Sequence, residues 1–182
     1  MESEEIIMGK NKDEIILGAG EVYIYEFDGA EIPDHETIET TEHNVGHCSG
    51  GFSVEYKPEK YDVKNQYGRT VKSFIINEEV TAKTGILSWD LDKLALLSTA
   101  KVETTSGKKT LTIGAGGSLK TALLRFVHTK ADGKKLRFTM VGQGGTGFSL
   151  DFNDKELTID AELTAVEKIS NFLASIEEEI TA

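Results

Sequence analysis

The stretch LTIDAELTA at residues 157–165 decides the fold class of this chain. Its leucine, isoleucine and alanine side chains fall on every second position, with threonine, aspartate and glutamate between them. Successive side chains of a strand point to opposite faces, so this period of two predicts a strand that is covered on one face only. A helix cannot gather these apolar residues on one side. The segment therefore indicates a β protein.

The same period recurs along most of the chain. Residues 22–27 are apolar on both faces, which predicts a strand covered on both sides. Pro58 either ends its run or places it at a sheet edge. Turn residues at 65–68 and the Asp-Gly pair at 132–133 mark the ends of hairpins. The pattern predicts an antiparallel β-sandwich or barrel, with further strands at 52–57, 70–76, 80–86, 100–105, 108–113, 120–128 and 134–141.

Four segments depart from this period. Residues 90–98 space their leucines for one helical face, and Asp90 is the expected N-cap of the one packed helix. Residues 28–50 form a long polar loop with room for one or two helical turns at 36–43. Residues 1–20 form an arm with two short apolar patches that are each closed by a glycine. The C-terminal segment 169–182 fits a strand or a helix equally well.

Composition limits the functions that this chain can have. Its 182 residues suit a single domain spanning 1–182, and the formal net charge of -11 disfavours a surface that grips nucleic acid. Cys48 is the only cysteine, which excludes an internal disulfide and fits a reducing compartment. We also expect no export signal and no membrane association, because the start is acidic and no run is long enough to span a bilayer.

Segments that resemble catalytic or binding motifs lack the context these motifs need. Residues 142–147 match GxGxxG, but the pattern works only when a helix follows, and strand is predicted there. His43, His47 and Cys48 have ligand chemistry but lie around a glycine-containing loop without obvious further ligands. We therefore expect no catalytic residues, no cofactor, no metal site and no enzyme activity.

The segment from Asn44 to Leu97 resembles part of the tail tube (major tail) proteins of long-tailed bacteriophages, in particular those with low-GC Gram-positive hosts. The resemblance extends loosely over residues 18–168. It departs from some relatives because the chain has no room for an added immunoglobulin-like domain, and because no clear match follows Lys168. The stretches that carry it are NVGHCSGGFSVEYKP (44–58), VKSF (71–74), EEV (78–80), KTGILSW (83–89) and KKLRFTM (134–140).

The resemblance implies a structural subunit in the virion tail that is made in the host bacterial cytoplasm. Such subunits join edge to edge into rings, usually hexameric, and the rings stack into a conduit for DNA ejection. The implied partners are further copies of the chain and other tail proteins, such as the tube initiator, the tape measure and the terminator. DNA passes through the lumen without specific binding, so we expect a net negative lumen wall.

We expect subunit contacts from the arm, the long loop and the C-terminal segment. The candidate interface residues are Ile6, Ile7, Ile15, Ile16, Leu17, Ile38, Val45, His47, Phe172 and Ile176. Two alternatives stay open from the sequence. One is the tube protein of a contractile injection system or a phage-tail-like bacteriocin, which shares the fold and the stacking. The other is a monomeric β-barrel that binds a small ligand, which needs an apolar interior cavity.

Overall fold

The computed structural model describes residues 18–114, 116–145, 147–150, 152 and 154–180. Strands hold 52% of the described residues and helices 6%, so the predicted mainly β class is confirmed. Each pairing between the described strands is antiparallel. The barrel alternative is wrong, because the main sheet does not close on itself.

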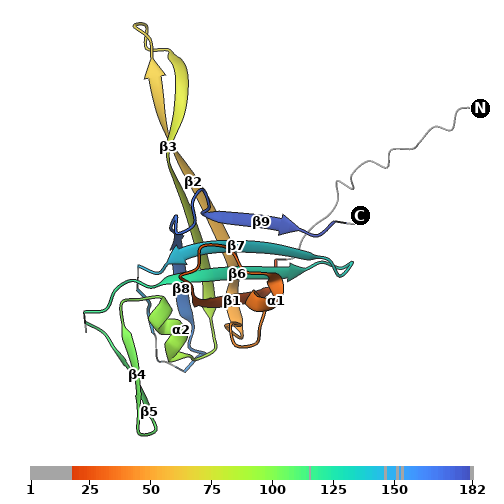
Figure 1. Cartoon of the computed structure of the whole chain (residues 1–182), viewed down its shortest axis with the longest axis vertical. Coiled ribbons are helices and arrows are strands. Elements are labelled where there is room, and N and C mark those ends of the chain that lie inside the picture. Colours follow the sequence, from red (N-terminus) through yellow and green to blue (C-terminus); the bar gives the residue numbers. More distant parts are fainter. Residues whose placement is uncertain (1–17, 115, 146, 151, 153, 181–182) are drawn as a thin grey trace, which may run out of the picture.

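The main sheet has seven strands, and a separate hairpin lies beside it (Figure 1). Across the sheet the order is β1 (Glu21–Glu26), β6 (Thr121–Thr129), β7 (Lys135–Gln143), β8 (Ile159–Ala165), β3 (Thr70–Ile86) and β2 (Cys48–Lys64), with β9 (Ala174–Glu178) also paired to β7. The separate hairpin consists of β4 (Lys101–Thr105) and β5 (Lys108–Thr112).

The sheet divides at β7, because two strands share one of its edges. β8 pairs with the end of β7, at Gly142 and Gln143. β9 pairs with its beginning, from Leu136 to Met140. From this division β8, β3 and β2 run across the first three strands, and their facing sides enclose the main core.

Two apolar clusters cover the two faces of β1, β6 and β7. The first lies between these strands and the other half of the sheet, and it includes Ile24, Leu124 and Leu163. The second lies on the outer face and includes Tyr23, Phe27, Ile38, Leu123, Val127 and Val141. Val22, Tyr23 and Ile24 are all buried. The predicted two-sided burial of residues 22–27 is thus confirmed for the middle of the strand.

Two short helices pack on the sheet. α2 (Leu91–Leu96) lies inside the predicted range 90–98, and Asp90 caps it by accepting a 2.9 Å hydrogen bond from the Asp92 backbone N–H. Lys93 of this helix donates hydrogen bonds to the carbonyls of Ile24 and Glu42. The loop contains a second helix, α1 (His35–Ile38), where the sequence left room for one or two helical turns at 36–43.

The largest difference from the predicted elements is the length of β2 and β3. Each has 17 residues, so the strand expected at 52–57 runs on through Pro58, and the two strands expected at 70–76 and 80–86 are one. Pro58 is tolerated because β2 is the edge strand of the sheet. The loop expected at 28–50 ends earlier, since β2 begins at Cys48.

Candidate assembly surface

The β2–β3 hairpin projects far beyond the rest of the protein (Figure 1). Its turn is built around Asn65, whose side-chain oxygen accepts hydrogen bonds from the backbone N–H groups of Tyr67 (3.0 Å) and Arg69 (3.1 Å). Gly68 completes the turn with a φ of 75°, a conformation that glycine adopts without steric cost. The turn therefore holds the two long strands in one register at the tip.

Large apolar side chains on this hairpin stay in solvent. Phe74 is 44% exposed and Tyr61 59% exposed. An exposed apolar patch of this kind on a folded protein commonly marks an interaction site. The other large exposed apolar residues of β2 and β3 are Val54, Tyr56, Val63, Val71, Ile75 and Ile76.

The apolar face of the hairpin changes sides along its length. Near the root, Tyr56 opposes Val80 on the face that continues into the core. Beyond a register shift that skips Ile76, Tyr61 opposes Phe74. Because Tyr61 lies an odd number of positions beyond Tyr56, this second pair points to the other face. The outer half therefore presents apolar side chains on a face that cannot pack on its own core.

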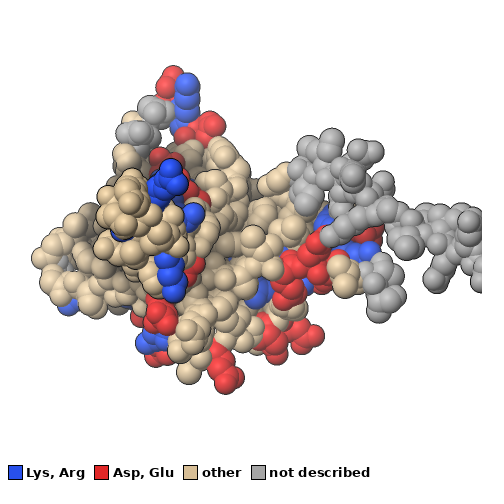
Figure 2. All heavy atoms as spheres, turned by 90° about the horizontal axis from the view of Figure 1, so that it is seen from above, with Lys and Arg blue, Asp and Glu red and all other residues tan. Residues whose placement is uncertain are grey.

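The outer part of the hairpin is basic, in contrast to the chain as a whole. We call residues 60–75 the distal hairpin; it contains one acidic residue, Asp62, and four basic ones, Lys60, Lys64, Arg69 and Lys72, for a net charge of +3. The complete chain has a net charge of -11. Figure 2 looks down on the hairpin and shows basic side chains over it, whereas acidic side chains gather elsewhere on this face.

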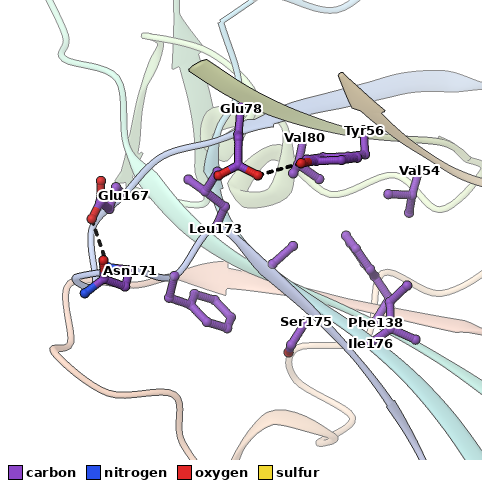
Figure 3. Close-up of a pocket in the computed structure, with 12 residues that line it drawn as sticks. Val54, Tyr56, Glu78, Val80, Phe138, Glu167, Asn171, Leu173, Ser175 and Ile176 are labelled. Carbon is purple, nitrogen blue, oxygen red and sulfur yellow. Dashed lines mark hydrogen bonds between the residues drawn. The ribbon is translucent and has the colours of Figure 1, made fainter. Parts of the chain in front are cut away.

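A groove of about 680 Å³ lies between the root of the hairpin and β9 (Figure 3). We call it the β9 groove. Most of its lining is apolar, and its two carboxyl side chains are Glu78 and Glu167. Its walls are formed by Val54, Tyr56, Glu78 and Val80 on the hairpin, by Phe138 on β7, and by Glu167 with residues 171–176 on the C-terminal segment.

Hydrogen bonds hold both carboxylates of the groove in place. The Tyr56 hydroxyl donates to Glu78 over 2.5 Å, and this bond raises the pKa of the tyrosine. The backbone N–H of Asn171 donates to Glu167 over 2.8 Å. Asn171 has a φ of 59°, so this bond supports the turn that leads into β9. The groove thus carries two fixed negative charges on an apolar surface.

Two strand edges lie open beside the groove. Within the described part of the chain, β3 pairs with β8 only from Thr81 to Ile86, which leaves residues 70–80 without a partner on that side. β9 likewise pairs with β7 alone. Unpaired strand edges offer backbone N–H and carbonyl groups to a further strand, so they favour association between chains.

An ion network beneath β9 anchors it to the sheet. Glu39 lies at its centre, where its carboxylate accepts from the Arg137 Nε (2.5 Å) and the Lys135 Nζ (2.8 Å) and lies 3.3 Å from Arg125. Burial alone raises the pKa of Glu39, but the hydrogen bonds from Arg137 and Lys135 outweigh it, and the pKa is lowered. A buried carboxylate that keeps its charge is paired in this way.

Arg137 of this network also binds two carboxylates at β9. Arg137 Nη1 lies 2.6 Å from Glu179 and 3.3 Å from Glu177. The Arg137 bond and a second one from the Lys135 backbone N–H lower the pKa of Glu179. Within the C-terminal segment, which is ambiguous by sequence, residues 174–178 form a strand because β7 pairs with them, and Arg137 and Lys135 bind the neighbouring glutamates.

An apolar pocket of about 10 Å³ lies between the two halves of the sheet and is lined by core residues such as Ile24, Leu124 and Leu163. A ligand site for a small molecule typically needs about 300 Å³ or more. This pocket gives no support to the ligand-binding alternative, which stays a prediction.

The structure brings some of the predicted interface residues to the surface and buries others. Ile176 is 72% exposed and lines the β9 groove together with the partly buried Phe172. His47 is exposed, and its backbone N–H donates to Ser88. Ile38 (0%) and Val45 (4%) are buried in the second and first clusters, so neither side chain lies on the surface of the described subunit. Ile6, Ile7, Ile15, Ile16 and Leu17 lie outside the described residues.

The burial of Ile38 and Val45 has a simple cause. The loop that carries them folds back along the open edge of β1, where the Val45 backbone N–H donates to the Val22 carbonyl and Ile24 donates to His43. Their side chains then fill the two faces of the strand. A polar loop with isolated apolar residues thus covers a sheet edge within the subunit.

Sequence reasoning missed the distal hairpin as a surface. The run Phe74-Ile75-Ile76, which lies between strongly polar stretches, was a signal for it. Such a run is equally typical of a buried strand, and only the structure shows that these side chains are exposed among the described residues.

The candidate binding motifs have structural roles. Within the described residues no helix follows residues 142–147, and Gly144 lies against the backbone of Leu97, where a Cβ would approach the Leu97 Cα to 2.6 Å. His43 stacks on Tyr25 with ring centres 4.1 Å apart. No group of three or more metal-ligating side chains is found in the part of the chain that the structure describes. Nor is any helix there long and apolar enough to cross a membrane.

Comparison with protein-family models and with curated proteins finds no match for this chain.

Proposed function

We propose that this chain is the subunit of a bacteriophage tail tube, a structural protein without catalytic activity. Copies assemble into rings, hexameric by the family resemblance, and the rings stack into the conduit through which DNA leaves the virion. The proposal joins the resemblance over residues 18–168 to the surfaces described above. Its partners are further copies of the chain and the other tail proteins that start, measure and end the tube.

One observation carries the proposal. The distal hairpin holds aromatic and aliphatic side chains in solvent on a face that its own core cannot reach, including Tyr61 (59% exposed) and Phe74 (44%). A soluble monomer gains nothing from such a surface, whereas a subunit buries it on assembly. The open edges of β3 and β9 support the same conclusion, since a neighbouring chain is the natural partner for an unpaired edge.

The geometry of assembly follows from symmetry. A contact between two different surfaces repeats from copy to copy, and it closes into a ring when the rotation allows and otherwise continues as a filament. A tube of stacked rings uses both outcomes: the contacts within a ring close, and the contacts between rings continue as a filament. The net charge of -11 per subunit suits a wall along which DNA slides without adhering.

Negative-stain electron microscopy of the purified chain, dilute and then concentrated, tests this proposal. We expect uniform rings or hollow tubes whose amount rises with concentration. Sedimentation velocity on the same samples gives the fraction of chain in assemblies. Monomers in both measurements at every concentration would contradict self-assembly and remove the basis of the proposal.

A further inference from the structure

We infer that the β9 groove receives the distal hairpin of a second copy of this chain. This inference rests on the proposed function and adds to it the partner of each surface. The two surfaces lie on one subunit but face away from each other, so each is available to a neighbour.

The surfaces of the two partners are both apolar. The groove has a volume of about 680 Å³, which is room for several side chains, and its exposed walls include Tyr56 (55%) and Ile176 (72%). The distal hairpin offers Tyr61 and Phe74 on one face. Inserting large side chains of this kind into a groove removes apolar area from water on both partners.

The N-terminal arm is the other apolar segment that could occupy the groove. The net charges of the two segments favour the hairpin. The distal hairpin has a net charge of +3, and the groove presents Glu78 and Glu167. Residues 1–17 contain five acidic residues and two lysines, a net charge of -3. Opposite charges favour the hairpin in the groove, and like charges disfavour the arm.

The hairpin cannot fill the groove of its own subunit. Val54, Tyr56, Glu78 and Val80 line the groove from the root of the same two strands. A strand advances about 3.3 Å per residue, so Tyr61 lies roughly 17 Å beyond Tyr56 along a continuous ribbon. The ribbon leads away from the groove (Figure 1). The contact therefore joins different copies head to tail, which is the kind of contact that builds rings and filaments.

Charge reversal on each side, alone and combined, tests the inference. One variant carries Arg69→Glu at the tip and Lys72→Glu beside Phe74 in the hairpin, and a second carries Glu78→Lys and Glu167→Lys in the groove. All four residues are exposed. Because the groove reversals also remove the acceptors of the Tyr56 hydroxyl and the Asn171 N–H, circular dichroism and urea unfolding check that the fold persists. The matched control is Lys101→Glu with Lys108→Glu, which makes the same charge change on the separate β4–β5 hairpin.

We expect each reversal alone to raise the concentration needed for assembly by about tenfold or more, because like charges then meet in the contact. The combined variant, in which both signs are exchanged, should assemble at close to the wild-type concentration. A mixture of the two single-side variants should also assemble, since each contact in an alternating chain again joins opposite charges. The control should change little.

The outcomes separate this inference from the proposed function. Suppose that the wild-type chain assembles but that the combined variant needs a concentration raised by as much as the two reversals together predict. The hairpin then does not occupy the groove. In that case the inference is wrong, and the tube proposal stands. If the control reversal impairs assembly as much as the hairpin reversal, the effect is one of net charge, and the inference is again wrong. A wild-type chain that never assembles would overturn both.

Discussion

The rings of Phe52 and Phe126 stack face to face, with centroids 4.5 Å apart and planes only 1° from parallel. Phe52 lies on β2 at one edge of the sheet, and Phe126 lies on β6, four positions away in strand order. Strands so far apart in one flat sheet cannot touch. The stack therefore shows that the two halves of the open sheet face each other across the core.

Truncating this stack should destabilise the subunit. We predict that Phe52→Ala lowers the free energy of unfolding by about 2–3 kcal/mol, somewhat less than for a fully buried ring because Phe52 is only partly buried. Urea titration measures this change. Phe152→Ala, at a residue that is 78% exposed, is the matched control and should stay within about 0.5 kcal/mol. Equal losses in the two variants would contradict the role of the stack.

Two adjacent glycines should respond differently to the same substitution. A Cβ on Gly144 would lie 2.6 Å from the Leu97 Cα and 2.7 Å from its carbonyl oxygen, whereas a Cβ on Gly145 has no atom within 4 Å. We therefore predict that Gly144→Ala costs about 1–3 kcal/mol and that Gly145→Ala is close to neutral. Thermal unfolding of the two variants in parallel provides the measurement. A stable Gly144→Ala protein would show that α2 does not pack on this turn.

Removing the charge at the centre of the ion network should loosen the C-terminal strand. In Glu39→Gln the buried Arg125 and Arg137 lose their shared carboxylate, and we predict a loss of roughly 3 kcal/mol. Glu36→Gln, on the exposed side of α1, is the control and should have little effect. Hydrogen exchange of β9 amides reports the local consequence, and unchanged protection there would count against the anchoring role.

The same network should make stability depend on pH on the acid side. The pKa of Glu39 is lowered in the folded state by hydrogen bonds that outweigh burial, so its contribution is present above its ordinary value of 4.5 and is lost as the pH falls through the lower folded value. Urea unfolding of the wild-type chain and of Glu39→Gln across this range isolates the effect. The stability gap between the two proteins should close on acidification, and a gap that widens would contradict the sign of the shift.

Apolar residues of the distal hairpin should matter for assembly but not for folding. Tyr61→Ser and Phe74→Ser change side chains that are 59% and 44% exposed, so the free energy of unfolding of the monomer should move by less than about 0.5 kcal/mol. Assembly observed by sedimentation and electron microscopy should be lost. Phe152→Ser and Ile113→Ser are controls outside the hairpin, at apolar residues that are more exposed (78% and 72%). If these controls abolish assembly equally, the distal hairpin is not the specific contact.

Local patterns in the sequence were enough to locate most elements. The alternation at 157–165 predicted β8, and Asp90 with its leucines predicted α2, since side-chain spacing and capping depend on residues that are neighbours in sequence. The candidate surface was only partly foreseen. Ile176 and Phe172 line the β9 groove, whereas Ile38 and Val45 are core residues.

The sequence by itself thus determined the β class, the turn positions and the main helix, because each depends on short-range spacing. Only the tertiary structure decided which apolar residues are covered, how Pro58 is accommodated in a single long hairpin, and that residues 174–178 form a strand. Those outcomes depend on pairing between segments far apart in the chain. One example is the binding of Glu177 and Glu179 to Arg137, which lies 40 and 42 positions away, a contact that local periodicity does not encode.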